Sequence, residues 1–157
     1  MYKIYIKRFL DICISLCALL LLSPLLLVVC ILVKVNIGSP IFFIQKRIGK
    51  NCKPFNMLKF RSMSGYRDKN GMLLPDEKRL TSFGIVLRKT SIDELPALVN
   101  ILKGDMSLIG PRPERPYFVN KFKESVPKYM IKHHVKPGMT GWAQIMDIGA
   151  ILPSLKG

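Results

Sequence analysis

Acidic residues are scarce in this chain of 157 residues. Ten aspartate and glutamate residues stand against 25 lysine and arginine residues, which gives a formal net charge of +15 at pH 7. The adjacent carboxylates Asp93 and Glu94 are conspicuous for that reason. Arg88 and Lys89 precede the pair and Arg112 follows it, so the acids can meet an anionic substrate that the cations hold. Phosphate chemistry needs groups of both signs, and this pair is the first candidate for catalysis.

Two phosphate-binding patterns are missing. The sequence contains no Gly-x-x-x-x-Gly-Lys-[Ser/Thr] and no Gly-x-Gly-x-x-Gly, which disfavours a nucleoside triphosphatase or a dinucleotide enzyme. Three of the four cysteines lie in an apolar segment and Cys52 stands alone, so their spacing indicates neither a disulfide framework nor a metal site. The adjacent His133 and His134 would point in different directions on a helix, which favours a solvated surface role over a ligand role.

A long apolar run covers residues 12–33, interrupted by Ser15, Ser23 and Pro24. As a helix, about 22 residues would reach about 33 Å, just enough to cross a hydrocarbon core of about 30 Å. Pro24 has no N–H to donate and its ring presses on the carbonyl of Leu20, and Ser23 beside it can take up a freed backbone group. We therefore expect a kink near the middle of the run.

The charges around the apolar run favour a re-entrant hairpin over a kinked span. Residues 9–22 and 25–36 would each form a half about 18–20 Å long, too short to cross alone. Basic residues flank both ends: Lys3, Lys7, Arg8 and Lys34. A hairpin keeps both flanks on the cytosolic side, whereas a straight span places one of them on the wrong side. The kinked span remains the alternative, and a cleaved signal peptide fits less well.

The next segment predicts a β-hairpin. Residues 41–44 and 55–63 have the composition of two short strands around a turn at residues 49–51. Six basic residues and no acid lie between Gln45 and Arg61: Lys46, Arg47, Lys50, Lys53, Lys59 and Arg61. Such a run is either a solvated or lipid-facing surface or a surface that faces phosphate groups.

Two further elements precede the carboxylate pair. Residues 64–76 are polar and rich in glycine and proline, which predicts a mobile loop of the kind that often forms a lid. Residues 81–89 predict a short helix that buries Phe83, Val86 and Leu87 and aims Arg88 at the start of the next element.

The carboxylate pair has a structural alternative, because Ser91 and Glu94 match a helix capping box. With Ser91 as N-cap, Pro96 would fall inside the helix and remove a hydrogen bond, so we place the helix start at Asp93 or Glu94. Both carboxylates would then lie at the positive end of the helix, which favours their ionised forms. Successive helical residues diverge by about 100°, so the two acids must differ in role. One can attack phosphorus while the other holds Mg²⁺ or orients a partner.

The segment downstream is dense in glycine and proline. Arg112 lies between two prolines, which suits a preorganised bidentate phosphate contact, and a structural salt bridge is the competing use. Residues 117–129 predict an amphipathic basic helix, and residues 136–142 predict a turn. Trp142 in that turn is either a core residue or a membrane-interface anchor.

Five short motifs follow one another over residues 3–144. They are Ser23-Pro24 in the apolar segment, 59–63 (KFRSM), 88–96 (RKTSIDELP), 104–113 (GDMSLIGPRP) and 136–144 (KPGMTGWAQ). Together they resemble the bacterial sugar transferases, the monotopic polyprenyl-phosphate phosphoglycosyl transferases that initiate glycan assembly.

The resemblance implies a reaction. A member of this family transfers a sugar 1-phosphate from a UDP-sugar to undecaprenyl phosphate and releases UMP, as the first membrane step of exopolysaccharide, capsule or glycoconjugate synthesis. By resemblance, Asp93 is the nucleophile that forms a covalent phosphosugar intermediate, and Asp93 and Glu94 together bind Mg²⁺. The remaining site residues implied are the phosphate-binding Arg88, Arg112, Lys59 and Arg61 and the helix-breaking Ser23 and Pro24.

The implied fold is α+β and mainly helical. Residues 1–38 would form a re-entrant membrane helix-break-helix, and residues 39–157 a small membrane-associated catalytic domain with a short β-hairpin and a C-terminus shorter than usual for the family. The expected location is the bacterial inner (cytoplasmic) membrane, with the catalytic domain facing the cytoplasm. Expected partners are membrane lipids and possible downstream glycosyltransferases, and no nucleic acid is expected.

The alternative function is a non-catalytic or weakly active truncated homologue that acts as a membrane-anchored basic binding module. Within the enzyme hypothesis, we expect the loop of residues 64–76 and the tail beyond Gln144 to choose the sugar.

Overall fold

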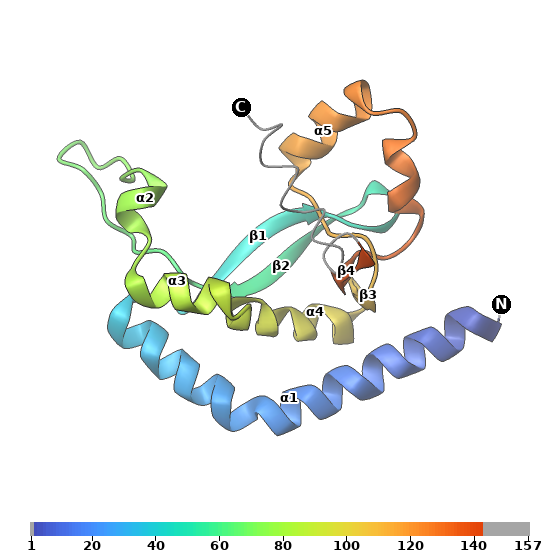
Figure 1. The fold of residues 1–157 in the computed structure, drawn as a ribbon, viewed down its shortest axis with the longest axis horizontal. Helices are drawn as coiled ribbons and strands as arrows, with labels where there is room; N and C mark the ends of the chain where they lie inside the picture. The colour runs from blue at the N-terminus through green and yellow to red at the C-terminus, as the bar shows by residue number, and fades with distance from the viewer. Residues whose placement is uncertain (1, 143–157) are drawn as a thin grey trace.

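The computed structural model describes residues 2–142, and in it the rest of the chain packs on one side of a single long N-terminal helix (Figure 1). The elements in chain order are α1 (Tyr2–Asn36), β1 (Phe42–Ile48), η1 (Lys50–Cys52), β2 (Pro54–Phe60), α2 (Asp76–Arg79), α3 (Ser82–Lys89), η2 (Ile92–Ala97), α4 (Leu98–Lys103), β3 (Ser107–Ile109), α5 (Pro116–Ser125), η3 (Tyr129–His134) and β4 (Gly138–Thr140). The expected mainly helical chain with a β-hairpin is confirmed. The last two residues of the 136–144 motif and the tail beyond Gln144 lie outside the described residues.

The long helix α1 bends near its middle, as Figure 1 shows, and Pro24 lies inside it. Ser23 Oγ donates a hydrogen bond of 2.8 Å to the Leu20 carbonyl, the acceptor that the missing N–H of Pro24 leaves free. The predicted kink and its compensation by Ser23 are therefore confirmed. The helix stays continuous through the bend, and its arrangement in a membrane as a re-entrant hairpin stays a prediction.

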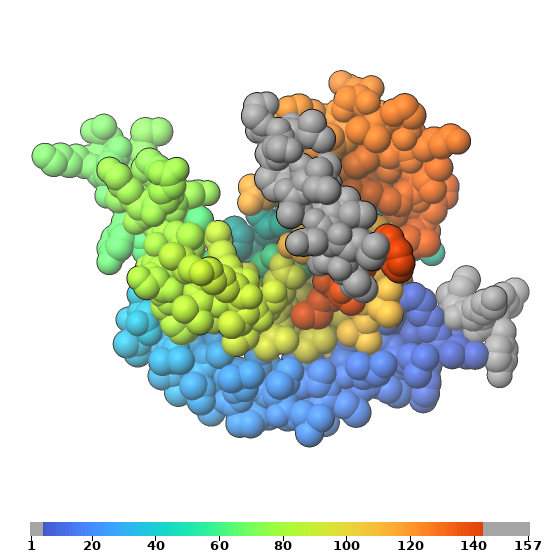
Figure 2. Space-filling model, viewed as in Figure 1, coloured from blue at the N-terminus to red at the C-terminus, as the bar shows by residue number. Residues whose placement is uncertain are grey.

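One face of α1 is apolar and exposed. The described residues contain one helix that is long and apolar enough to cross a membrane, Tyr5–Asn36, with a mean hydropathy of 3.1 over its most apolar window and only 11% of that window buried. Leu21 and Val35 are 79% and 76% exposed. Figure 2 shows the rest of the molecule stacked on the opposite side of this helix. By length, composition and exposure, α1 has the properties of a membrane-embedded helix.

The other face of α1 is fixed to α4 through polar and apolar contacts. Arg8 donates from Nη1 to the Ile101 carbonyl at 2.6 Å and from Nη2 to the Leu102 carbonyl at 2.8 Å. These carbonyls belong to the last turn of α4, where the C=O groups lack the N–H donor four residues later that an α-helix would supply, and where the helix dipole favours cations. Ala18 and Leu19 of α1 pack against the cluster of buried side chains around α4.

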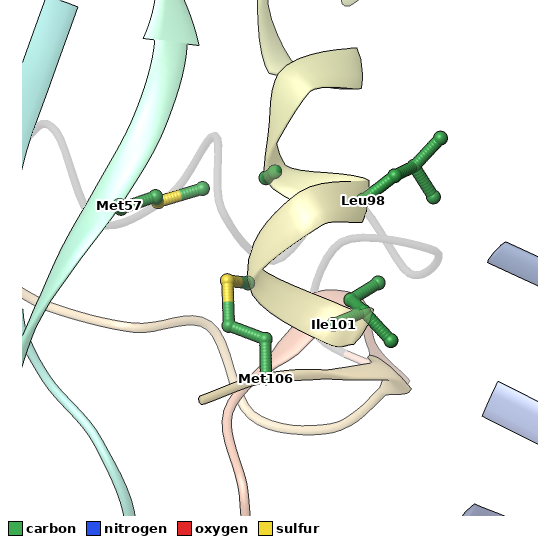
Figure 3. Close-up of a cluster of buried hydrophobic side chains, with 5 residues drawn as sticks. Met57, Leu98, Ile101 and Met106 are labelled. Carbon is green, nitrogen blue, oxygen red and sulfur yellow. The ribbon is translucent and has the colours of Figure 1, made fainter. Parts of the chain in front are cut away.

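Two clusters of buried side chains hold the hairpin, α4 and α1 together. The first contains Met57, Ala97, Leu98, Ile101 and Met106. Figure 3 shows Met57 on β2 facing one side of α4, while Leu98 and Ile101 point away from β2. The second cluster contains Val29 and Val33 of α1, Phe60 of β2 and Leu87 of α3. The segment η2, which carries the carboxylate pair, thus packs between the hairpin and α1.

The hairpin β1–β2 is antiparallel, with a register from Phe42↔Phe60 to Ile48↔Pro54. It confirms the predicted hairpin, although β2 ends at Phe60 rather than at residue 63. The buried Asn100 ties α4 to β2, because its Oδ1 accepts from the Leu58 N–H at 3.0 Å and its Nδ2 donates to the Asn56 carbonyl at 2.8 Å.

A second, parallel pair of strands was not predicted. Strand β3 pairs with β4, with Ser107 opposite Gly138 and Ile109 opposite Thr140. The prediction of a turn over residues 136–142 was therefore wrong for its central residues. Gly110 and Gly138 permit the close approach, because a Cβ at Gly138 would lie 2.1 Å from the Gly110 nitrogen.

Several smaller predictions need correction. In α3, Thr81 accepts from the Gly84 N–H at 3.0 Å and caps the helix, and Leu87 is buried as predicted. Val86 is instead 55% exposed, since it lies about 100° around the helix from Leu87. The helix predicted over residues 117–129 ends at Ser125.

Two aromatic side chains near the C-terminal end of the described chain also differ from expectation. His133 is only 5% exposed and packs edge-on against the Tyr129 ring at 5.9 Å, so the predicted solvated role is wrong for this histidine. Trp142 is 73% exposed, which excludes its use as a core residue. A role for Trp142 as a membrane-interface anchor stays a prediction.

Candidate active site

The carboxylate pair lines a cavity of about 1020 Å³ bounded by the hairpin, η2 and the proline-rich loop after β3. The cavity wall is strongly cationic. Its basic residues are Arg47, Lys59, Arg61, Arg79, Arg88, Arg112 and Arg115, and its acids are Asp76, Asp93 and Glu94. The four predicted phosphate-binding residues thus lie in the same cavity as the pair, whereas Ser23 and Pro24 lie in α1 and do not line it.

The backbone around the pair forms a 3₁₀-helix, η2, and the α-helix α4 begins only at Leu98. The predicted helix start at Asp93 or Glu94 is therefore wrong, and so is the capping-box alternative. Ser91 has a φ of 56° and its side chain caps no backbone N–H in η2. Pro96 explains the delay, because it lacks the N–H that an α-helix would require at its position.

Asp93 is buried, with 8% of its surface exposed. Burial raises the pKa of its carboxyl group above the ordinary value, Lys59 and Arg88 act in the opposite direction, and the charge of Glu94 adds to the rise. The expectation that the helix terminus would favour ionisation of both acids is wrong for Asp93. Its carboxylate is a desolvated base held near two cations.

Glu94 has the opposite character. Burial acts to raise its pKa, but Lys59, Arg112 and Arg47 together lower the pKa below the ordinary value. Lys59 Nζ donates to Glu94 Oε1 at 2.7 Å, and Arg112 Nη2 donates to the same oxygen at 3.1 Å. The two adjacent acids therefore occupy different electrostatic environments, which agrees with the prediction that they differ in role.

The predicted cations are held by backbone and side-chain oxygens. Arg88 Nε donates to Ser62 Oγ at 2.9 Å, and Arg61 Nε donates to the Met63 carbonyl at 2.8 Å. Of the two uses left open for Arg112, the structure shows the salt bridge to Glu94, but its side chain is 48% exposed. Arg112 can therefore also reach a ligand in the cavity.

Sequence analysis missed the contribution of β1. Phe43, Gln45 and Arg47 alternate along this strand and line the cavity. Arg47 donates to Gln45 Oε1 from Nη2 at 2.6 Å and from Nε at 3.1 Å, and from Nη1 to the Pro113 carbonyl at 2.9 Å. Burial lowers the pKa of Arg47 from its ordinary value. The alternation in the predicted strand, together with the position of Arg47 in the basic run, was the signal that could have assigned these residues to the site.

The loop predicted over residues 64–76 reaches the cavity as well. It forms an arm beside α2, at the end of the molecule away from α5 (Figure 1). An isolated bridge between Arg67 and Leu73 closes this arm. Leu73 lines the cavity, as do Asp76 and Arg79 of α2, which pair at 3.3 Å. The position of the arm is compatible with the predicted lid, whose movement stays a prediction.

Known proteins similar to this chain agree with the character of the site. A relative from Aeromonas hydrophila, "UDP-N-acetylgalactosamine-undecaprenyl-phosphate N-acetylgalactosaminephosphotransferase", is 45% identical over 144 residues, which are 90% of this chain and 34% of the relative. The "UDP-glucose:undecaprenyl-phosphate glucose-1-phosphate transferase" of Escherichia coli (strain K12) is 40% identical over 142 residues, 89% of this chain and 31% of the relative. The chain thus spans about a third of the length of these two proteins.

A shorter relative aligns over most of both sequences. The "Uncharacterized sugar transferase EpsL" of Bacillus subtilis (strain 168) is 48% identical over 146 residues, which are 93% of this chain and 71% of the relative. A family model described as "Bacterial sugar transferase" matches residues 2–153, and this range includes both the bent helix and every residue of the cavity wall. The chain belongs to the bacterial sugar transferase family.

Proposed function

We propose that the chain is a phosphoglycosyl transferase, which moves a sugar 1-phosphate from a UDP-sugar to undecaprenyl phosphate and releases UMP. The observation that carries the proposal is the buried Asp93, placed beside the ionised Glu94 in a cavity whose other charged groups are mostly cations. The names of the Aeromonas and Escherichia relatives support the reaction class, and they differ in the sugar.

In the proposed mechanism, Asp93 forms a covalent intermediate. A carboxylate oxygen of Asp93 attacks the phosphorus that carries the sugar, and the bond from this phosphorus to the oxygen of UMP breaks, so UMP leaves. An oxygen of undecaprenyl phosphate then attacks the same phosphorus, and the bond to Asp93 breaks. The product is the sugar attached to undecaprenyl diphosphate, and the Asp93 carboxylate is regenerated.

The environment of Asp93 suits a nucleophile. Burial removes water from the carboxylate and raises its pKa, which makes the oxygen a stronger base. Lys59 and Arg88 oppose this rise in pKa, so the ionised form stays accessible. Reactive carboxylates of this kind combine desolvation with a specific charged partner.

The cations of the wall would bind the diphosphate of the donor and the phosphate of the acceptor. Guanidinium groups bind phosphate oxygens through paired N–H donors. The charge of Arg88 acts on Asp93, and Arg112 contacts Glu94. Arg47, anchored at Gln45 and at the Pro113 carbonyl, would hold the Arg112 loop in place. Charge that develops on the phosphoryl oxygens during transfer is then stabilised by groups already in position.

The acidic pair also fits Mg²⁺. This ion is usually held by one or two carboxylates together with substrate phosphates rather than by a full set of protein ligands. Within residues 2–142 no group of three or more His, Cys, Asp or Glu side chains could hold a metal by itself, so substrate oxygens would have to complete the coordination. Both cation contacts of Glu94 go to Oε1. Glu94 and Asp93 would hold the ion, which would neutralise the negative charge of the diphosphate.

The apolar face of α1 supports a location at the membrane, where undecaprenyl phosphate resides. We place the chain in the bacterial inner membrane with its cavity on the cytoplasmic side, and the bend at Pro24 fits a re-entrant hairpin. Enzymes that extend the glycan would act on the lipid-linked product. The intact acidic pair favours an enzyme over a non-catalytic basic module.

The test uses the full chain in lipid nanodiscs. UMP release is measured with a panel of UDP-sugars, with and without undecaprenyl phosphate and Mg²⁺, and intact mass spectrometry follows the protein after incubation with donor alone. We expect UMP release that requires both additions for sustained turnover, and a mass increase of one phosphosugar.

The nucleophile is tested separately. Asp93→Ala should show no adduct, while Asp76→Ala, which removes the other aspartate of the cavity wall, should retain it. Wild-type protein that releases no UMP from any UDP-sugar would refute the reaction. Full turnover by Asp93→Ala would refute the assigned nucleophile.

A further inference from the structure

Asp11 is an acid in an unusual place. It is the only aspartate or glutamate among the first 67 residues, it lies in the apolar helix α1, and it is 5% exposed. A buried carboxylate is costly unless hydrogen bonds and an opposite charge compensate it. The catalytic cavity does not include Asp11, so the site described above does not account for it.

Asp11 contacts strand β3 and one neighbouring lysine. Asp11 Oδ1 accepts from Ser107 Oγ at 3.1 Å and from the Leu108 N–H at 3.1 Å. Lys7, one turn earlier on α1, lies 3.8 Å from Asp11 Oδ2, donates to the Ile109 carbonyl at 3.1 Å and also donates to Ser107 Oγ. One turn of α1 therefore binds three consecutive residues of the strand.

One of these contacts satisfies a backbone donor on the free edge of a two-stranded sheet. The other edge of β3 faces β4, where the Ser107 N–H donates to the Pro137 carbonyl at 2.9 Å and the Gly110 N–H donates to the Thr140 carbonyl at 2.9 Å. The Leu108 N–H points away from β4, where a third strand would otherwise offer a carbonyl. Asp11 supplies that acceptor, and Lys7 donates to the carbonyl of the next residue, Ile109.

The strand held in this way leads directly into the catalytic cavity. Leu108 lines the cavity, and Arg112, which contacts Glu94, follows four residues later. The segment between Leu108 and Arg112 has little room to move. The Gly138 N–H donates to the Pro111 carbonyl at 2.9 Å, and a Cβ on Gly110 would lie 2.5 Å from the Lys136 carbonyl oxygen. A shift of β3 against α1 would therefore displace Arg112.

We propose that Asp11 is a positioning residue, which fixes strand β3 to the membrane helix and so sets the position of Leu108 and Arg112 in the cavity. Asp11 acts through these residues and touches no substrate. The activity readout below rests on the proposed function. The exchange readout does not, so failure of one proposal can be told from failure of the other.

The first experiment measures hydrogen exchange of the Leu108 amide in the full chain in nanodiscs. Asp11→Ala removes the acceptor, and the Leu108 amide should exchange about 10-fold faster or more, because hydrogen bonds to charged groups are among the stronger ones. Asp11→Asn retains an acceptor oxygen and should keep most of the protection. Ser15→Ala is the matched control, since Ser15 is fully buried one turn further along the same helix. Unchanged exchange in Asp11→Ala would overturn the proposal.

The second experiment is a double-mutant cycle on UMP release with Asp11→Ala and Arg112→Ala. We expect Asp11→Ala to lower kcat/KM about 10-fold in the wild-type background and much less when Arg112 is already absent, since the positioned group is then missing. Asp11→Asn should restore most of the activity. Two independent effects that multiply would assign Asp11 a general role in stability and overturn its role in positioning Arg112. A wild-type chain without UMP release would instead refute the proposed function, while the exchange result still decides whether Asp11 anchors the strand.

Discussion

Lys59 Nζ lies 2.7 Å from Glu94 Oε1, and the two side chains are only 14% and 15% exposed. Water and salt therefore screen this ion pair less than a pair on the surface. Lys59 belongs to β2 and Glu94 to η2, so the contact joins two walls of the cavity. Lys59 also acts on the neighbouring Asp93, whose pKa it lowers against the effect of burial. One lysine thus influences both acids.

Replacement of this lysine should change the pH dependence of the reaction. The nucleophilic form of Asp93 is the carboxylate, which is lost as the pH falls through its pKa. In Lys59→Met the opposing cation is gone, so the pKa of Asp93 should rise further and the acid limb of the kcat profile should move to higher pH. The measurement is UMP release as a function of pH, and we expect a loss of activity at neutral pH of about 10-fold or more.

Lys53→Met is the control for this experiment, because it removes an exposed lysine from the hairpin turn without touching the cavity. Its pH profile should match that of the wild type. An unchanged acid limb in Lys59→Met would mean that Lys59 does not set the ionisation of Asp93.

Removal of Glu94 should destabilise the fold at neutral pH. Glu94→Ala leaves Lys59 and Arg112 without their common partner, and we expect a loss of about 1–3 kcal/mol in the free energy of unfolding. The pKa of Glu94 is lowered in the folded protein, so the unfolded chain binds the proton more tightly. The contribution of Glu94 is therefore present above its ordinary pKa and is lost as the pH falls through the lower folded value.

Denaturant unfolding of wild type and Glu94→Ala over a pH series tests both statements. The gap between the two proteins should narrow as the pH falls below the ordinary pKa of glutamate, 4.5. Glu124→Ala, at the end of α5 and outside the cavity, should follow the wild type at every pH. A gap that is constant with pH would show that the ionised form of Glu94 has no special role in stability.

Features encoded by local sequence were predictable. The hairpin follows from strand composition around a turn, and the bend in α1 follows from a proline whose freed carbonyl the adjacent Ser23 satisfies. The collection of cations around the acidic pair was suggested by composition alone, since phosphate chemistry would need both signs. The hairpin and the bend each depend on residues close together in the chain, and the cations depend on the overall charge.

Features that depend on distant segments were not predictable in the same way. Strands β3 and β4 are three residues each and lie about thirty positions apart. Neither is long enough to show the alternation of apolar and polar residues by which a strand is recognised in a sequence. Their pairing depends on the two glycines that allow the backbones to approach. The burial of Asp11 depends likewise on a contact between the N-terminal helix and β3.

The conformation of the acidic pair lies between these cases. Pro96 correctly argued against a capping box at Ser91, but it delayed the α-helix further than expected and left the pair in a 3₁₀-helix. The ionisation of Asp93 could not be inferred from the helix terminus, because burial by the surrounding chain outweighs it. Local chemistry identified the residues, and tertiary packing determined their environment.

Gly84 should be intolerant of a side chain. A Cβ at this position would lie 1.9 Å from the Ser62 carbonyl oxygen, which belongs to the backbone and cannot move independently. Gly84→Ala should push α3 away from the segment after β2 and separate Arg88 from Ser62. We expect a loss of about 1–3 kcal/mol in stability, measured by denaturant unfolding, and reduced UMP release.

Gly65→Ala is the matched control. The nearest atom to its Cβ would be the end of the flexible Arg61 side chain, at 2.6 Å, which can move aside. This variant should lose much less stability than Gly84→Ala. Equal losses would indicate that the close approach at Gly84 is not a constraint on the fold.

Pro24 should determine the topology of α1 in the membrane. In Pro24→Ala the residue regains an N–H that can bond to the Leu20 carbonyl, so the helix can straighten over a length sufficient to span the bilayer. Protease accessibility of tags at both ends should show both on one side in the wild type and opposite sides in a large share of Pro24→Ala chains. Leu27→Ala, a change on the exposed face of the same helix, should retain the wild-type pattern. Tags on opposite sides in the wild type would identify α1 as a kinked span and exclude the re-entrant hairpin.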